Sequence, residues 1–162
     1  HARLAAKVVG AVTAAASIRR EAAISFAINA ALSLAFFLGL YGFTPRALRW
    51  TAPDGLALDF VPQSLAVALM SALVPALIAC RRLRNGPPLR PILLRAGLFA
   101  IAGACLGALL ARVASGAELP AIAWSTALAG KMLYGGVLGA LVATLALRPL
   151  LATATVSTRK MH

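Results

Sequence analysis

A lysine interrupts an apolar stretch near the carboxyl end of the chain. Lys131 lies within residues 121–147, where the other side chains are apolar, small or hydroxyl-bearing. An ammonium group at the centre of a membrane-spanning helix costs about 2.5 to 3.5 kcal/mol, so this lysine is expected to face protein or water. At ~1.5 Å per residue, Lys131 lies ~15 Å below the outer end of its segment, close to the middle of a membrane.

Three other polar side chains are expected at the depth of Lys131. Counting along the apolar segments places Asn29, Ser71 and Tyr134 in the same layer, and it places no carboxylate there. Three roles for Lys131 are open. In the first role, Lys131 donates to Asn29, Ser71 and backbone carbonyls and so fixes the register of the helices. In the second, it meets an acidic group or a lipid of a partner subunit. In the third, it lines an aqueous path that binds an anion or relays a proton.

Residues for catalysis or metal binding are sparse. The predicted spans hold no pair of carboxylates and no Cys/His or Ser/His arrangement, and His1 and His162 are the terminal residues. Cys80 and Cys105 do not form a CxxC pair, and we interpret them as small packing residues. The sequence therefore predicts no enzyme, no cofactor and no metal site.

The composition is typical of a membrane protein. Hydrophobic residues make up 61% of the chain and charged residues 12%, whereas a soluble domain has about 25% charged residues. The net charge of +12 comes from sixteen Lys and Arg that lie mostly between apolar blocks. This pattern orients membrane proteins, and it differs from the basic face of a nucleic-acid-binding module. We expect no nucleic-acid partner.

Four apolar blocks are long enough to cross a bilayer as helices. They comprise residues 22–43, 61–80, 92–113 and 121–147. The first block is longer than the apolar part of a signal peptide, so we interpret it as a retained helix. The predicted fold is an all-α membrane protein, a four-transmembrane-helix bundle in which residues 1–162 form a single domain.

The basic residues predict the orientation of these spans. Twelve lie in the N-terminal segment 1–20, the middle loop 81–91 with its flank, and the C-terminal tail, whereas the two other loops hold three. The positive-inside rule then places both termini in the cytoplasm (N-in/C-in) of a bacterial inner membrane, with several passes. The cytoplasmic arginines are expected to contact anionic lipid head groups.

Small residues mark the expected helix contacts. The third span carries Gly103 and Gly107 four residues apart, and the fourth carries Gly135 and Gly139. Such spacing lets two backbones approach closely, so these two spans are predicted to cross, with a contact between subunits as the alternative. The two halves of the chain also resemble each other in their order of arginine, helix, acid and proline, as a parallel repeat or by chance.

Two functional hypotheses follow. The first is a non-catalytic membrane protein that acts by helix packing, as an accessory or assembly subunit of a larger complex or as a homo-oligomer, with a membrane-protein partner or a second copy of itself. The alternative is a small channel or transporter for an anion or a proton-coupled solute that uses Lys131 and Asn29.

Overall fold

A computed structural model describes residues 2–82 and 89–159. Over these ranges the chain forms four helices and one short ladder: α1 (Ala2–Tyr41), β1 (Ala47–Leu48), α2 (Phe60–Arg82), α3 (Leu89–Gly116), β2 (Ile122–Ala123) and α4 (Trp124–Arg159). The two strands pair antiparallel, with Ala47 opposite Ala123 and Leu48 opposite Ile122. The predicted all-helical fold class is confirmed.

Three of the helices are long and apolar enough to cross a membrane. These stretches are Ile18–Tyr41, Leu89–Gly116 and Trp124–Ala146, whereas the apolar part of α2, Phe60–Pro75, is shorter. Their length and composition indicate a membrane protein. Crossing by α2 and the orientation of the bundle stay predictions.

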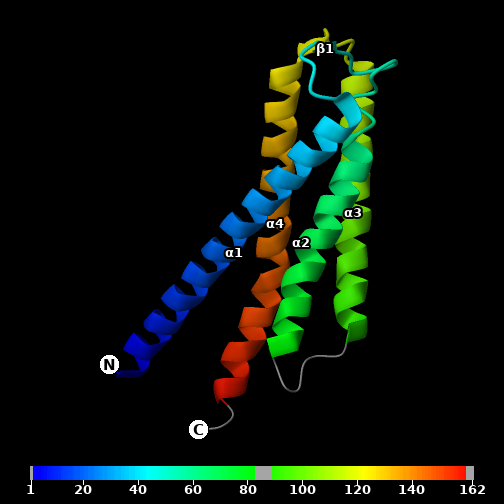
Figure 1. The fold of residues 1–162 in the computed structure, drawn as a ribbon. Helices are drawn as coiled ribbons and strands as arrows, with labels where there is room; N and C mark the ends of the chain where they lie inside the picture. Colours follow the sequence, from blue (N-terminus) through cyan, green and yellow to red (C-terminus); the bar gives the residue numbers. More distant parts are fainter. Residues whose placement is uncertain (1, 83–88, 160–162) are drawn as a thin grey trace.

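The helices pack in the order α1, α4, α2, α3 (Figure 1). The most extensive contacts join α1 to α4 and α2 to α3, and a smaller contact joins α2 to α4. Helix α1 crosses the others at an angle and diverges from them toward its N-terminal end (Figure 1). The bundle therefore consists of two closely packed pairs that meet through α2 and α4.

The glycines lie at close helix contacts, but the predicted crossing of α3 with α4 is wrong. A Cβ added at Gly103 would lie 2.6 Å from the Ser64 carbonyl oxygen of α2. Gly135 and Gly139 instead face Ser33 and Asn29 of α1. The spacing of small residues identifies a face that a backbone can approach, and it carries no information about which helix approaches it.

The two hairpins share one pattern of buried positions. Buried residues recur at the same spacing in α2 (Ser64, Val67, Ala68, Ser71, Ala72) and in α4 (Gly135, Leu138, Gly139, Val142, Ala143). If α1 is exchanged with α3 and α2 with α4, the packing of α1 on α4 corresponds to the packing of α3 on α2. Such spacing of buried residues is that of any helix with one buried face, so the parallel repeat stays a prediction.

The loop between α1 and α2 fills a recess at the end of the bundle that carries β1 and β2, which we call the outer end. The first residue of α2, Phe60, lies against Gly107, which is ~13 Å before the end of α3. Helix α2 thus begins well below the outer ends of its neighbours. Leu48 and Leu56 of the loop enter this space and are 0% and 1% exposed. The same loop contains strand β1.

Two tryptophans hold this loop to the rest of the bundle. The Trp50 indole Nε1 donates to the Pro120 carbonyl oxygen at 3.1 Å, and the Trp124 Nε1 donates to the Gly42 carbonyl oxygen at 3.1 Å. Each bond joins the first loop to the segment around β2. The two indole rings are half-buried and pack against the loop, while their N–H groups are satisfied by these hydrogen bonds.

Asp54 gives this loop a dependence on pH. The Arg49 backbone amide donates to its carboxylate at 2.8 Å and the Arg46 guanidinium pairs with it, and together they hold the pKa of Asp54 below its usual range. A carboxylate whose pKa is lower in the folded than in the unfolded protein stabilises the fold at a pH above its unfolded pKa, which is about 3.9 for aspartate. This contribution is lost as the pH falls through the pKa of the folded protein. We expect acidification below about pH 4 to change the fluorescence of Trp50, with a smaller change in Asp54→Asn. An equal response in both proteins would contradict this assignment.

Candidate functional site

Lys131 forms a buried ion pair with Asp59. Its Nζ lies 2.9 Å from Asp59 Oδ2, and the side chains are 3% and 13% exposed. The ammonium group also lies 3.7 Å from the centre of the Phe60 ring, within the range of a cation–π interaction. The expectation that no carboxylate lies at the depth of Lys131 is therefore wrong.

The recessed start of α2 explains this pairing. Asp59 immediately precedes α2 and lies outside the predicted span 61–80, which is why no carboxylate was expected at the depth of Lys131. Because α2 starts deep in the bundle, the loop carries Asp59 down to the level of Lys131, ~10 Å inside α4. The position just before a helix also favours a carboxylate, since the N-terminal end of the helix dipole is positive.

Polar side chains continue inward from the ion pair. Gln63 Nε2 donates to Ser33 Oγ at 2.9 Å and to the Lys131 carbonyl oxygen at 3.1 Å. The Gln63 side chain therefore joins α1, α2 and α4 one turn below Asp59. Nothing in the sequence indicated that Gln63 joins these three helices.

A second group of hydrogen bonds lies deeper. Asn29 Nδ2 donates to Ser71 Oγ at 2.9 Å and to the Ser25 carbonyl oxygen at 2.7 Å. Ser25 Oγ donates to the Gly139 carbonyl oxygen at 2.9 Å. These bonds and the ion pair form what we call the polar column, made of Asp59, Lys131, Gln63, Ser33, Asn29, Ser71 and Ser25.

The predicted polar layer is only partly brought together. Asn29 and Ser71 are hydrogen-bonded to each other, whereas Lys131 lies nearer the outer end of the bundle, with Gln63 between them. Tyr134 lies beside the column, where its Oη and Ser64 Oγ are 2.6 Å apart and its ring packs edge-on against Phe60 at 5.1 Å. The four residues thus belong to one region but to different levels.

The spacing of α1 contained a signal for this column. Ser25, Asn29 and Ser33 are four residues apart, which places them on one helix face, and all three are buried. The same face continues with Phe37 and Tyr41 at its outer end. A polar stripe of this kind in an otherwise apolar helix predicts a buried polar contact, although it does not identify the partner.

Two acceptors in the column lack donors. Asn29 Oδ1 and Gln63 Oε1 are buried, and within the described residues neither accepts a hydrogen bond. Buried polar atoms are normally satisfied by protein or water, so each of these oxygens can accept a hydrogen bond from a water molecule or from another donor. Both oxygens lie in the column on the inner side of the Asp59–Lys131 pair, where a displaced ammonium group, a water or a polar solute can donate to them.

Comparisons with known proteins bring no assignment. No protein-family model, curated protein or solved structure matches this chain.

Across residues 2–82 and 89–159, no three His, Cys, Asp or Glu side chains are grouped to hold a metal ion. The chemistry that this arrangement offers is the exchange of a proton between a carboxylate and an ammonium group, beside acceptors that can receive the ammonium.

Proposed function

We propose that this chain is a small carrier or channel that moves a proton or a proton-coupled anionic solute along the polar column. In this proposal it is a multi-pass protein of a bacterial inner membrane, with four spans and both termini in the cytoplasm. The observation that supports this best is the buried pair of Asp59 and Lys131, held at 2.9 Å. Ionisable groups within membrane helices are costly, and they commonly form proton relays and solute pathways.

The column offers a mechanism in which protonation frees the lysine. With Asp59 ionised, the two charges neutralise each other against the Phe60 ring. A proton that binds Asp59 removes the attraction, and the ammonium of Lys131 can then turn to other acceptors of the column, such as Gln63 Oε1. The unpaired positive charge attracts an anion, and loss of the proton restores the ion pair.

Proton flux into liposomes tests this proposal. Purified protein is reconstituted in vesicles that enclose a pH-sensitive dye, and a potassium diffusion potential drives protons inward. We expect flux above that of empty vesicles, and at least tenfold less in Asp59→Asn, because the neutral amide cannot carry the proton. Asp54→Asn is the matched control, since this substitution is in the same loop but outside the polar column, and it should retain flux.

The outcome against the proposal is equally definite. If the folded wild-type protein passes no more protons or anions than empty vesicles, or if Asp59→Asn and Asp54→Asn conduct alike, the column is not a pathway. Circular dichroism and gel filtration of each variant in detergent establish that the compared proteins are folded.

The second candidate is an accessory or assembly subunit, or a homo-oligomer, that acts by helix packing. It is favoured by broad apolar faces on helices that have few neighbours, with Phe36 of α1 61% exposed and Leu98 of α3 66% exposed. In this case Lys131 and Asp59 serve only to hold α4 to α2. Lys131→Met would then disrupt the fold or a complex isolated in mild detergent, in a protein that shows no flux at all.

A further inference from the structure

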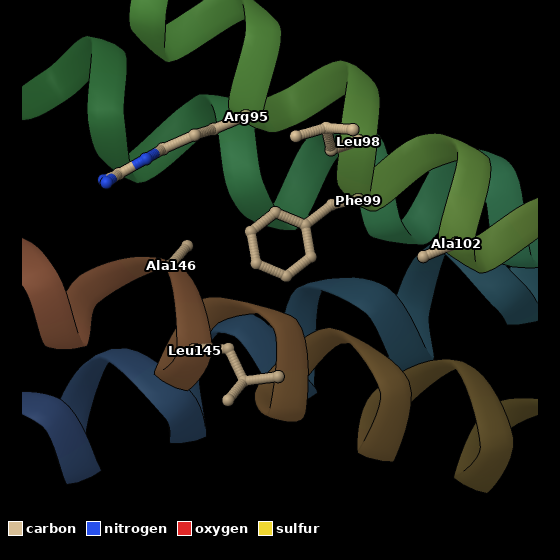
Figure 2. Close-up of a pocket in the computed structure, with 6 residues that line it drawn as sticks. All are labelled: Arg95, Leu98, Phe99, Ala102, Leu145 and Ala146. Carbon is tan, nitrogen blue, oxygen red and sulfur yellow. The ribbon is translucent and has the colours of Figure 1, made fainter.

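A groove opens between α3 and α4, on the side away from α1. Its volume is about 390 Å³, and it is lined by Arg95, Leu98, Phe99, Ala102, Leu145 and Ala146 (Figure 2). The Phe99 ring projects into the space between the two helices, and Leu145 lies on α4 on the other side of this space (Figure 2). The groove is separate from the polar column, which lies between α1, α2 and α4.

The gap between α3 and α4 differs from the gap between α1 and α2, another pair of consecutive helices. In the other half of the bundle, the corresponding gap between α1 and α2 is bridged by Asn29, which donates to Ser71 Oγ at 2.9 Å, and by Ser25, which lies 3.4 Å from the same oxygen. Among the described residues, no hydrogen bond joins α3 to α4 across the groove, where Phe99 and Ala146 are apolar. Helices α3 and α4 each pack on α2 and leave the space between them open.

One end of the groove carries a cation. Arg95 lies ~9 Å from the start of α3, and its side chain extends along the opening toward that end of the helix (Figure 2). Of the carboxylates that the structure describes, none forms a salt bridge with Arg95. An arginine near the end of a membrane helix extends its charge to the interface while its stem covers apolar surface. The groove thus combines an apolar wall with a positive charge at head-group depth.

We infer that this groove binds one anionic phospholipid, with part of an acyl chain along Phe99 and Leu98 and the phosphate on the Arg95 guanidinium. Charge complementarity identifies the occupant, because Arg95 is the only charged residue among the described residues that line the groove. A guanidinium bonds phosphate oxygens through two parallel N–H groups, and basic pockets between membrane helices bind anionic head groups. The volume of about 390 Å³ fits one chain segment and not a whole lipid.

Native mass spectrometry of the whole protein in mild detergent tests this site. Delipidated protein is titrated with phosphatidylglycerol or with phosphatidylcholine of the same chain length, and the bound lipids per chain are counted. We expect one phosphatidylglycerol to bind first and more tightly than phosphatidylcholine. Arg95→Gln should weaken this binding about fivefold, since one basic residue at the surface contributes on the order of a fivefold change in affinity. Ala102→Phe should weaken binding of both lipids, because the ring fills the groove.

Arg112→Gln is the matched control, because Arg112 is also an exposed arginine of α3 but lies near the opposite end of the helix. It should leave the first binding step unchanged. Equal affinity for the two lipids, or the same loss in Arg112→Gln as in Arg95→Gln, would overturn the inference and identify a general attraction of a basic protein for anionic lipid. Thermal denaturation of each variant without lipid verifies that the groove variants are folded.

Discussion

Lys131→Met is expected to lower the free energy of unfolding by about 3 to 5 kcal/mol, because it leaves the carboxylate of Asp59 in a buried site without its partner. Asp59 is 13% exposed and lies 2.9 Å from the lysine Nζ, so solvent replaces little of the lost interaction. Equilibrium unfolding in mixed micelles, followed by helical circular dichroism, measures the change. Two other variants separate the ion pair from simple side-chain packing.

The first is the double variant Asp59→Asn with Lys131→Met. It removes both charges, so we expect it to recover more than half of the loss in Lys131→Met. The second is Arg46→Met, which breaks the other salt bridge of the described chain, where the arginine side chain is 48% exposed and solvent screens the charges. Its cost should stay below about 1 kcal/mol. If Lys131→Met is as mild as Arg46→Met, or if the double variant is no better than the single one, the buried pair does not hold the bundle together.

The sequence predicted that Lys131 faces protein or water and not lipid, and the physical reason is the cost of exposing an ammonium group to lipid. Its side chain is 3% exposed. Hydropathy likewise identified the helices α1, α3 and α4, since only a helix can satisfy its own backbone in hydrocarbon. These predictions depend on local composition, and each can be made from a single segment of the chain.

The partner of Lys131 could not be predicted because it depends on where one helix begins in space. Counting residues from the ends of the apolar blocks assumes that all helices start at the same level, whereas α2 starts in a recess that the preceding loop fills with Leu48 and Leu56. Asp59 therefore lies inside the bundle and not at its surface. The partners of the glycines were missed for a related reason, because any apolar helix with a matching face can approach a stripe of small residues.

The contact between α2 and α3 predicts that replacing glycine by alanine has different effects on stability at Gly107 and at Gly97 of α3. A Cβ at Gly107 would lie 2.8 Å from Val61 Cα and overlap the Phe60 carbonyl oxygen, and these backbone atoms cannot rotate away. We expect Gly107→Ala to destabilise the protein by about 1 to 3 kcal/mol, since α2 must shift to admit the methyl group. At Gly97 a Cβ would meet nothing within 4 Å, so Gly97→Ala should be neutral or stabilise the helix by up to about 1 kcal/mol.

Both variants are compared by equilibrium unfolding in the mixed micelles used for the ion pair. A shift of α2 also moves Phe60, which lies against the ammonium of Lys131, so Gly107→Ala should reduce proton flux in liposomes as well as stability. Gly97→Ala lies away from this contact and should leave flux unchanged. Equal stability of the two variants would show that α3 does not pack against α2 at Gly107. A loss of stability in Gly107→Ala without any change in flux would separate this packing contact from the polar column.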